Sequence, residues 1–551
     1  MTYSETLRGS LGWTVLVSVL AASMAPLACA SSDDDTPADA DDSADSGGAP
    51  GDDDGDGTGD LPDYSGLARG RARAGGAFVH LFEWRWPDVA RECEEFLGPH
   101  GFAAVQISPS NAHAVLPNQP WYERYQPAGY ELESRSGTRA EFIDMVQRCD
   151  AAGVDIYVDA VINHMTAQAS GTNSAGNAYT KYEYEGLYTE ADFHVPACGI
   201  AGSDYANDAD AVRNCELVGL SDLRTESDSV RQKITDYLVS YVELGVRGFR
   251  IDAAKHMNPA DLQDIVARVS EAVGAEKAPY YFLEVIDNGN EAISAEEYLD
   301  VAGTSGSTVD ITDFRYQNEV SQAFYYAASS PMLFTLENLS EGDFLPSDRA
   351  VVFTNNHDTQ RNDTVAFYQS GAFADLANVF LLGWPQGYPQ LMSSYAFSRQ
   401  LTGQGPPSGA NNATLAVYPD GAEQPNCLAH GDLTTPIGWI CEHRHPAIAE
   451  MVGFRIDIAE EPVANLWTNG GNQLAFGRGS RGFVVLNGEG GPLSAELATG
   501  LPAGSYCDRL TGGRNGDSCR GSQVEVGADG LAQLDVPAQS ALVIDERGRL
   551  P

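Results

Sequence analysis

The stretch GFRIDAAKH, residues 248–256, decides the fold class of this 551-residue chain. It starts as a short apolar strand and ends in polar side chains, and it includes Arg250 and Asp252. Because side chains alternate across a strand, these two face the same side, whereas Phe249 and Ile251 face the other. A strand of this kind, set between longer helical stretches, is typical of a parallel β/α unit.

Further short, β-branched apolar runs alternate with helical stretches along the chain. Eight such units are what a closed (β/α)8 barrel requires. We therefore predict an α/β fold with a TIM barrel, and the expected strands are Ala77–Trp84, Ala103–Ser108, Asp155–Asn163, Gly248–Ala254, Tyr280–Ile286, Ser307–Phe314, Ala350–Asn356 and Gly387–Tyr395.

Two regions depart from this alternation. Residues 165–222 are rich in Gly, Asn, Tyr and Asp, and we interpret them as a subdomain inserted after the third strand. After about Pro462, short strands punctuated by Gly and Pro predict an all-β sandwich domain. The expected domains are the barrel at 64–164 and 223–462, the insertion at 165–222 and the C-terminal β domain at 463–551.

The N-terminal region predicts export. Arg8 precedes an apolar run, Leu11–Ala28, which is short for a membrane span and indicates a signal peptide over residues 1–29. The run ends in PLAC, which resembles the lipobox of bacterial lipoproteins except for its proline, and Cys29 is therefore a candidate lipid anchor. Residues 30–63 carry thirteen Asp and no Lys or Arg, which predicts a solvated, disordered linker. We expect an extracellular or outer-surface, lipid-anchored protein.

The cysteines fit an exported protein. Apart from Cys29 there are eight, an even number that suits an oxidising compartment. No CxxC or Cys/His cluster occurs, so the sequence gives little support for a zinc site. Close spacings suggest the pairs Cys198 with Cys215, Cys427 with Cys441 and Cys507 with Cys519, which leaves Cys93 for Cys149.

The net charge narrows the class of partners. With 78 acidic and 33 basic residues, the chain carries a formal charge of −45. Such a charge repels phosphate, so general nucleic-acid binding is not expected. The acidic run of the linker lacks the alternating spacing and turn glycine of a calcium loop, and we interpret it as solvated chain.

Carboxylates occur at the carboxyl ends of the predicted strands, where the active sites of TIM barrels lie. Asp252 lies beside Arg250, whose guanidinium favours the ionised carboxylate that a nucleophile requires. Glu284 ends the run YYFLE, and its apolar neighbours favour the protonated form that a general acid needs. These residue types at strand ends indicate acid–base chemistry.

Two more strands end in such groups: His357 and Asp358 close VVFTNNHD, and YVDAVINH contains Asp159, Asn163 and His164. In this order the four segments resemble the four motifs of the α-amylase family, glycoside hydrolase family 13. Further segments, among them HLFEWRW, PWYERYQP, NQLAFGRGSRGF and GLPAGSYCD, resemble the animal-type α-amylases from about Gly76 to the C-terminus. The fold that this family has is the barrel, insertion and β domain already predicted.

The resemblance implies roles for three carboxylates. Asp252 matches the nucleophile that forms a covalent β-glycosyl intermediate, Glu284 the general acid and base, and Asp358 the stabiliser of the transition state. A retaining glycosidase needs the first two carboxyls about 5 to 5.5 Å apart on opposite sides of the scissile bond. His164, Arg250 and His357 would position the substrate and the nucleophile.

The resemblance also implies substrate contacts: Trp121, Tyr122, Tyr125 and Gln126 in PWYERYQP, and Lys255 and His256 toward the reducing-side sugars. Aromatic side chains more often choose the core. The charged neighbours Glu123 and Arg124 nevertheless favour a wet loop that lines a cleft. The three aromatic residues would then form a platform on which glucose rings stack.

A calcium ion between barrel and insertion is a further implication of the resemblance. Its ligands would be the side chains of Asn163 and Asp222 and the backbone carbonyls of Arg213 and His256. A set made only of oxygen ligands suits a hard cation such as calcium.

Chloride is not expected. Animal-type members that bind chloride use two basic residues and an asparagine, and only Arg250 and Asn356 match here, because the second basic position is Gln390. A neutral amide lacks most of the attraction of a cation for an anion. The segment NDTVAF, residues 362–367, which comes directly after NNHDTQR, also departs from the glycine-rich loop of the animal enzymes.

Together these features predict a secreted, calcium-dependent, monomeric α-amylase that hydrolyses internal α-1,4-glucosidic bonds of starch, glycogen and maltooligosaccharides with retention. Membrane attachment is expected only through the N-terminal anchor. One alternative is a maltooligosaccharide-forming or transglycosylating member, which barrel motifs separate poorly. The other is a non-catalytic glycan-binding lipoprotein, against which the presence of all three carboxylates counts.

Overall fold

The computed structural model describes residues 62–362, 364–409, 413–432 and 434–551. The predicted signal peptide, Cys29 and the linker up to residue 61 lie outside the described residues. Within the described ranges, no helix has both the length and the apolar character that crossing a bilayer requires.

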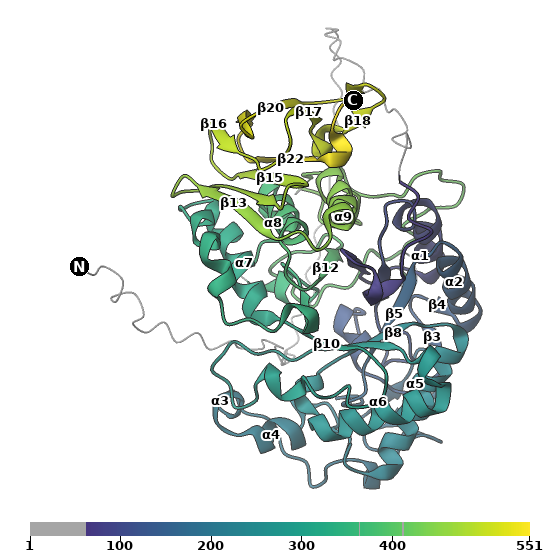
Figure 1. Cartoon of the computed structure of the whole chain (residues 1–551). Coiled ribbons are helices and arrows are strands. Elements are labelled where there is room, and N and C mark those ends of the chain that lie inside the picture. Colours follow the sequence, from purple (N-terminus) through teal and green to yellow (C-terminus); the bar gives the residue numbers. More distant parts are fainter. Residues whose placement is uncertain (1–61, 363, 410–412, 433) are drawn as a thin grey trace, which may run out of the picture. The chain divides into compact units, whose positions relative to one another are not determined.

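Eight parallel strands close into a barrel in the order β1-β12-β11-β10-β9-β8-β5-β2, which confirms the predicted fold class (Figure 1). Each predicted run contributes one strand. The strands are shorter than the runs, because the chain leaves the ladder at the polar residues that end each run. Their bounds are β1 Phe78–Leu81, β2 Ala104–Ile107, β5 Asp155–Ala160, β8 Gly248–Ile251, β9 Tyr280–Leu283, β10 Val309–Thr312, β11 Ala350–Val352 and β12 Tyr388–Ser393.

Helices surround the strands: α1 Trp86–Glu92, α2 Arg139–Ala151, α5 Asp228–Leu244, α6 Pro259–Val273, α7 Phe314–Ala327 and α8 Ala372–Gly383, with α9 Pro446–Ile458 after the last strand. One expected helix does not form. Between β9 and β10 there is only the short 3₁₀ helix Ala295–Tyr298. The Asp287 carboxylate accepts the backbone N–H groups of Gly289 and Ala295, at 2.7 and 3.0 Å, and so holds this connection as a loop.

The barrel has different cores inside and outside. Its interior is filled by aromatic side chains, including Phe78, Tyr157 and Phe282. Phe249 of β8 instead faces outward, with its ring 6.2 Å from that of Tyr241 on α5. The alternation predicted for β8 is thereby confirmed, and the inward direction is left for the polar side chain of the same strand.

The insertion contains little regular structure. Its elements are a hairpin of β6 Ser170–Thr172 and β7 Ala178–Thr180, and the short helices α3 Asp204–Asn207 and α4 Ala209–Asn214. A second small hairpin, β3 Glu133–Ser134 with β4 Gly137–Thr138, precedes α2. Both hairpins follow carboxyl ends of barrel strands, so they lie at the end of the barrel that carries the candidate site.

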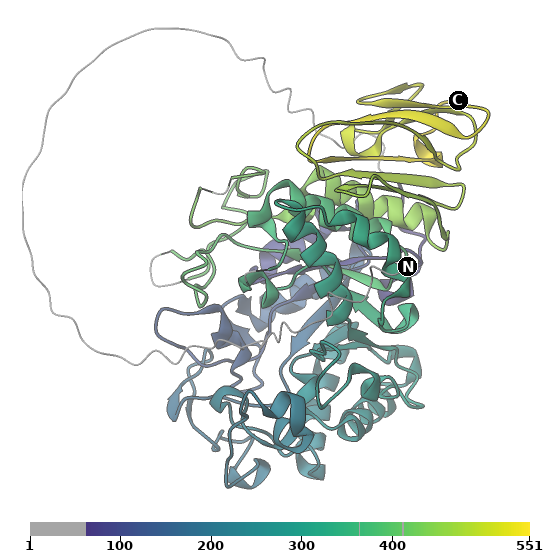
Figure 2. The same cartoon turned by 90° about the vertical axis from the view of Figure 1, so that its left-hand side faces the viewer.

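The C-terminal region is all-β, as predicted. Four antiparallel strands form one sheet: β13 Val463–Thr468, β14 Gln473–Arg478, β15 Gly482–Asn487 and β22 Ser540–Asp545. The other pairs are β16 Leu493–Ala498 with β21 Leu531–Val536, β17 Gly504–Cys507 with β20 Gln523–Val526, and β18 Arg514–Asn515 with β19 Ser518–Cys519. Figure 2 shows these strands in yellow, lying side by side.

Buried polar contacts join this β region to the barrel helices. The Asn472 amide donates to the carbonyl oxygens of Ala327 and Ser330, at 3.0 and 2.9 Å. Arg478 donates to the carbonyl of Gly383 at the end of α8, at 2.6 Å. Satisfied buried hydrogen bonds of this kind fix the register between packed elements.

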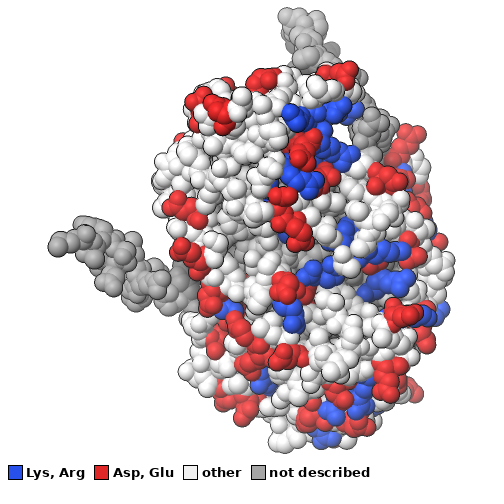
Figure 3. Space-filling view, viewed as in Figure 1, with Lys and Arg blue, Asp and Glu red and all other residues white. Residues whose placement is uncertain are grey.

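All four predicted disulfides are present: Cys93–Cys149, Cys198–Cys215, Cys427–Cys441 and Cys507–Cys519. On the surface, basic side chains lie next to acidic ones on the face that Figure 3 displays. An exposed pair of this kind is Arg481 with Glu546, whose charged atoms lie 3.0 Å apart.

A buried carboxylate, Glu92, ties the end of α1 to the segment before α9. One of its oxygens lies 2.8 Å from His443 Nε2 and accepts Arg444 Nε at 2.7 Å, and the other accepts Arg444 Nη2 at 2.8 Å and the Tyr418 hydroxyl. Burial raises the pKa of Glu92, but the hydrogen bonds from His443 and Arg444 and their charges outweigh it and lower this pKa to about 2.

Replacing this carboxylate should destabilise the protein in a pH-dependent way. We expect Glu92→Gln to lower the free energy of unfolding at pH 7 by about 3 kcal/mol. The folded pKa lies below the unfolded value, so the contribution is complete above about pH 4.5 and is lost as the pH falls toward 2. Urea unfolding at pH 7, 4 and 3 should therefore show a narrowing difference from the wild type.

Glu95→Gln is the matched control, because Glu95 lies one turn from Arg91 with 45% of its side chain exposed. It should change stability by less than about 0.5 kcal/mol. A difference between Glu92→Gln and wild type that stays constant with pH would contradict the account of this cluster.

Candidate active site

Arg250 gathers three carboxylates at the carboxyl end of the barrel. Its Nη1 lies 2.6 Å from Asp159 Oδ1 and 3.0 Å from Asp252 Oδ1, and its Nη2 donates to a Glu284 oxygen. All four residues are buried. The guanidinium therefore joins acidic groups from the neighbouring units β5, β8 and β9.

The strand register explains this convergence. Asp159 of β5 lies opposite Arg250 of β8. Asp252 and Glu284 directly follow β8 and β9, and their backbone N–H groups extend the ladder to Ala160 O at 3.1 Å and Ile251 O at 3.0 Å. Arg250 and Asp252 thus point to the same side, as the alternation along this segment predicted.

The charge balance of the cluster differs from the sequence prediction. We expected Arg250 to keep Asp252 ionised. The structure instead shows one guanidinium divided among three carboxylates, and burial raises the pKa of Asp252 well above its usual range although Arg250 opposes it. Burial also raises the pKa of Asp159. The cluster therefore favours the neutral form of Asp252 and of Asp159 more than an isolated guanidinium–carboxylate pair would.

Glu284 is held by a strained backbone turn. Ala253, the residue after Asp252, has a φ of 50° and a ψ of 30°, a left-handed conformation that costs a non-glycine residue about 1 kcal/mol or more. This turn directs the Ala253 N–H to Glu284 Oε2 at 2.9 Å. Both Glu284 oxygens therefore accept hydrogen bonds, one from Arg250 and one from the backbone.

Asp358 approaches the cluster from another strand and is more accessible. It lies in the loop after β11, 43% of its side chain is exposed, and its Oδ2 is 3.3 Å from His357 Nε2. Desolvation, followed by the charge of Glu284, raises the pKa of Asp358. The structure therefore brings the third predicted carboxylate within electrostatic reach of the other two.

Aromatic rings form a wall beside these carboxylates. The Tyr125 ring stacks on His357 with centroids 5.0 Å apart, and its hydroxyl donates to Asp159 Oδ2 at 2.9 Å. The Trp121 ring lies 5.6 Å from His357, and the Tyr122 ring lies 5.8 Å from Trp121. Tyr125 is buried, whereas Trp121 and Tyr122 are half-buried and keep accessible ring surface.

Four other predicted substrate contacts engage protein atoms in this structure. Gln126 Oε1 accepts the Ala167 N–H at 3.1 Å, and His164 Nε2 lies 3.1 Å from the Tyr125 carbonyl. His256 Nδ1 lies 2.8 Å from the carbonyl of Val212, and Lys255 donates to Ile286 O at 2.6 Å and to Glu291. Burial lowers the pKa of His164 and of His256 to about 4, so both imidazoles are neutral at pH 7. Burial also lowers the pKa of Lys255, to about 8.

The residues predicted for a calcium site fit an oxygen-liganded cation. The side-chain nitrogen of Asn163 lies 3.4 Å from Asp222 Oδ1. The oxygen and nitrogen of such an amide are told apart only by their hydrogen bonds, so a turned amide would place its oxygen toward a cation here. Helix α4, which carries Arg213, packs on the 3₁₀ turn Ala254–His256. No donor in the described ranges bonds to the carbonyl oxygens of Arg213 and His256. Burial raises the pKa of Asp222 to about 6, a cost that a bound cation would offset.

The position of the second basic chloride ligand holds an amide pair. The Gln390 amide donates to Gln106, whose own amide lies 3.4 Å from Asp159. The side-chain oxygen of Asn356 accepts the N–H groups of Asp358 and Thr359, at 3.0 and 2.8 Å.

Arg361 is a site residue that the sequence reasoning missed. Its guanidinium lies 4.5 Å from the Trp121 ring and 4.6 Å from that of Phe397. It also donates to the carbonyls of Thr402, at 3.0 Å, and His357. The only signal was a cation three residues after Asp358 in HDTQR, and nothing in the sequence shows that distant loops would meet it.

His80 of β1 was also missed. Its ring is fully buried, 5.4 Å from that of His357, and neither of its nitrogens has a partner among the described residues. Burial lowers the pKa of His80 well below its usual value, so it is a neutral group beneath the site.

Comparison with known proteins gives consistent matches. Residues 101–390 match the family described as "Alpha amylase, catalytic domain", and residues 467–546 match "Alpha amylase, C-terminal all-beta domain". The chain is 42% identical to pancreatic alpha-amylase of Sus scrofa over 84% of this chain and 92% of that protein. It is 40% identical to an alpha-amylase of Pecten maximus over 84% of this chain and 90% of that one.

Comparison with solved structures points to the same family. A mutant of alpha-amylase I from Eisenia fetida in complex with maltohexaose has a TM-score of 0.75 and 33% identity, and the match covers 87% of this chain and 98% of that one. The wild-type form of that protein has a TM-score of 0.76 and 33% identity, over 86% and 97% of the two chains.

Arg361 should support the aromatic wall. We expect Arg361→Lys to lower the free energy of unfolding by about 1 to 2 kcal/mol, because an ammonium cannot stack on two rings and reach both carbonyls. In hydrogen–deuterium exchange, amides in residues 399–405 should exchange several times faster. Arg148→Lys, at a partly exposed arginine in α2 that pairs with Glu94 and Asp144, is the control. Equal exchange of residues 399–405 in both variants would show that Arg361 does not hold this loop.

Proposed function

Because the chain belongs to the α-amylase family of glycoside hydrolases, we propose that it hydrolyses internal α-1,4-glucosidic bonds of starch, glycogen and maltooligosaccharides with retention of configuration. The observation that carries this proposal is the junction of Asp159, Asp252 and Glu284 on Arg250. On this one guanidinium, the two carboxylates proposed to react, Asp252 and Glu284, lie side by side from adjacent strands, next to an aromatic wall.

In the first step, Asp252 attacks the anomeric carbon while the glycosidic bond breaks. Glu284, acting as the general acid, gives its proton to the departing oxygen, and a covalent glycosyl–Asp252 intermediate results. In the second step, Glu284 takes a proton from water, the water oxygen bonds to the anomeric carbon and Asp252 leaves. Two inversions restore the original configuration.

Arg250 and Asp358 would stabilise the charges that form during these two steps. Arg250 bonds to Asp252 and Glu284 at once, so it stabilises whichever of them is ionised. Glu284 must exchange one of its present hydrogen bonds for the departing oxygen, and such tightening on substrate binding is common. Asp358, the most accessible of the three, would bind sugar hydroxyls and stabilise the positive charge of the oxocarbenium-like transition state.

Trp121 and Tyr122 would stack against glucose rings, since both keep accessible ring surface next to the carboxylates. The complex of the Eisenia fetida relative with maltohexaose supports a linear glucan as the ligand. Tyr125 would act mainly by supporting His357 and Asp159. Gln126, His164, Lys255 and His256 would reach sugar only after exchanging their present partners.

We also infer that a calcium ion joins barrel and insertion through Asn163, Asp222 and the carbonyls of Arg213 and His256. This ion would fix the loop that carries His164 and the turn that carries Lys255. Chloride is not part of the proposal, because the Gln390 position is neutral and its amide is already used by Gln106. Export by the N-terminal signal, anchoring at Cys29 and a monomeric state remain sequence predictions.

The product pattern tests the proposed reaction. In an NMR time course on maltoheptaose, we expect the wild type to release α-anomers of mixed lengths. Asp252→Asn should reduce the rate at least about 10³-fold, since the amide cannot form the glycosyl intermediate. Asp150→Asn, in an exposed ion pair with Arg69, should retain the wild-type rate.

Initial β-anomers would refute retention, and products of a single short length would favour the maltooligosaccharide-forming alternative. A wild type that binds maltoheptaose without cutting it would replace the hydrolase proposal with the glycan-binding one.

The calcium site has a readout independent of activity. Chelation with EDTA should lower the Tm of the wild type by several degrees, and added Ca²⁺ should restore it. Asp222→Asn should start with a lower Tm and respond much less to EDTA, while the control Asp210→Asn in α4 behaves as the wild type. A wild-type Tm that is insensitive to EDTA would contradict the proposed ion.

A further inference from the structure

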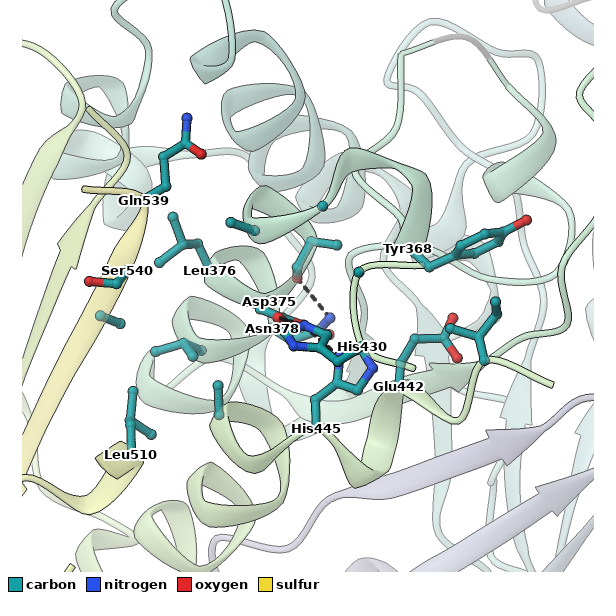
Figure 4. Close-up of a pocket in the computed structure, with 18 of the residues that line it drawn as sticks. Tyr368, Asp375, Leu376, Asn378, His430, Glu442, His445, Leu510, Gln539 and Ser540 are labelled. Atoms are coloured by element: carbon teal, nitrogen blue, oxygen red, sulfur yellow. Dashed lines mark hydrogen bonds and ion pairs between the residues drawn. The ribbon is translucent and has the colours of Figure 1, made fainter. Parts of the chain in front are cut away.

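Three side chains that are far apart in the sequence meet away from the carboxylate cluster (Figure 4). Asp375 lies in the first turn of α8, His445 directly precedes α9, and His430 lies in the loop that the Cys427–Cys441 disulfide closes. His430 Nε2 is 2.6 Å from Asp375 Oδ2, and His445 Nδ1 is 2.9 Å from Asp375 Oδ1. One ligand atom from each residue lies within 4.8 Å of the other two.

The surroundings leave room for an ion and its water. The three residues line a cavity of about 360 Å³, together with Glu442 and parts of the C-terminal domain. The side chains of Asp375 and His445 are only 15% and 14% exposed, whereas that of His430 is 57% exposed. The group is thus fixed on the protein side and open to solvent at His430, which provides an entry path.

The donor set selects the class of ion. Two imidazole nitrogens and one carboxylate oxygen are ligands of zinc and related transition metals, which often keep a water as the fourth ligand. Calcium takes oxygen ligands, so this group differs in chemistry from the set at Asn163 and Asp222. We propose that Asp375, His430 and His445 bind a divalent transition-metal ion of the zinc class.

Binding requires only small movements. Zinc–nitrogen and zinc–oxygen bonds of about 2.0 to 2.1 Å place tetrahedral ligands about 3.3 Å apart. The present separations of 2.6 and 2.9 Å are hydrogen bonds, so each side chain retreats by less than about 1 Å. To bind the ion, each imidazole must carry its one proton on the other ring nitrogen, so that the nitrogen now bonded to Asp375 offers a lone pair.

The ion would act as a structural clamp. It links the disulfide-closed loop 427–441 to the start of α8 and the start of α9, and residues 510–511 and 539–541 of the C-terminal domain line the same cavity. None of the three ligands belongs to the Arg250 cluster, so the clamp is separate from the proposed hydrolysis.

Zinc titration of the full chain tests this proposal. The protein is treated with EDTA, dialysed, loaded with excess Ca²⁺ and titrated with ZnCl₂ in a calorimeter. The wild type should bind one zinc ion with a Kd of about 1 μM or tighter. His430→Ala and His445→Ala should each bind at least about tenfold more weakly. Co²⁺ should give the visible absorption of a tetrahedral site in the wild type only.

His194→Ala is the matched control, because His194 contacts the carboxylates of Asp222 and Glu226 and is the competing histidine–carboxylate group. Its zinc affinity should equal that of the wild type. His430 is exposed, so His430→Ala decides the matter even if His445→Ala fails to fold. The proposal is overturned if calcium-loaded wild type binds no zinc, if His430→Ala binds it as tightly, or if only His194→Ala loses it.

Discussion

The guanidinium of Arg250 is shared by three carboxylates, and the arrangement of the candidate site depends on this sharing. Without a cation, three acidic groups buried this closely would repel one another and lose their solvation. With only one cation for three carboxylates, the cluster remains negatively biased. The same interaction therefore positions the proposed nucleophile, Asp252, beside the proposed proton donor, Glu284.

The barrel makes this sharing possible. Strand register places Asp159 opposite Arg250, and the adjacent strand delivers Glu284 to the other side of the guanidinium. Aromatic packing fills the barrel below, so the polar groups gather at its carboxyl end. The wall above is assembled from loops, where Arg361 links Trp121 to the carbonyl of Thr402. Rigid strands thus carry the proposed reacting groups, and stacked loops carry the surfaces proposed for a sugar.

The sequence predicted the parts that local patterns determine. Apolar runs ending in polar residues predicted all eight strands, and close spacing predicted three disulfides and left Cys93 to pair with Cys149. It did not predict the loop between β9 and β10, which Asp287 holds through its own backbone contacts. Nor could it show how Arg250 divides its charge. The Asp375 group was invisible because its histidines lie 55 and 70 residues further on, and only tertiary packing joins them.

The most direct measurement is chemical trapping of the glycosyl–enzyme. A fluorinated α-glucosyl fluoride forms the glycosyl–enzyme readily, and this glycosyl–enzyme then hydrolyses slowly. Mass spectrometry of proteolytic peptides can therefore locate the attached sugar. We predict one hexose-derived label per chain, on the peptide that contains Asp252. A label on Glu284 or Asp358 would contradict the assigned roles, and the absence of any adduct in an enzyme that still cleaves maltoheptaose would contradict the covalent mechanism.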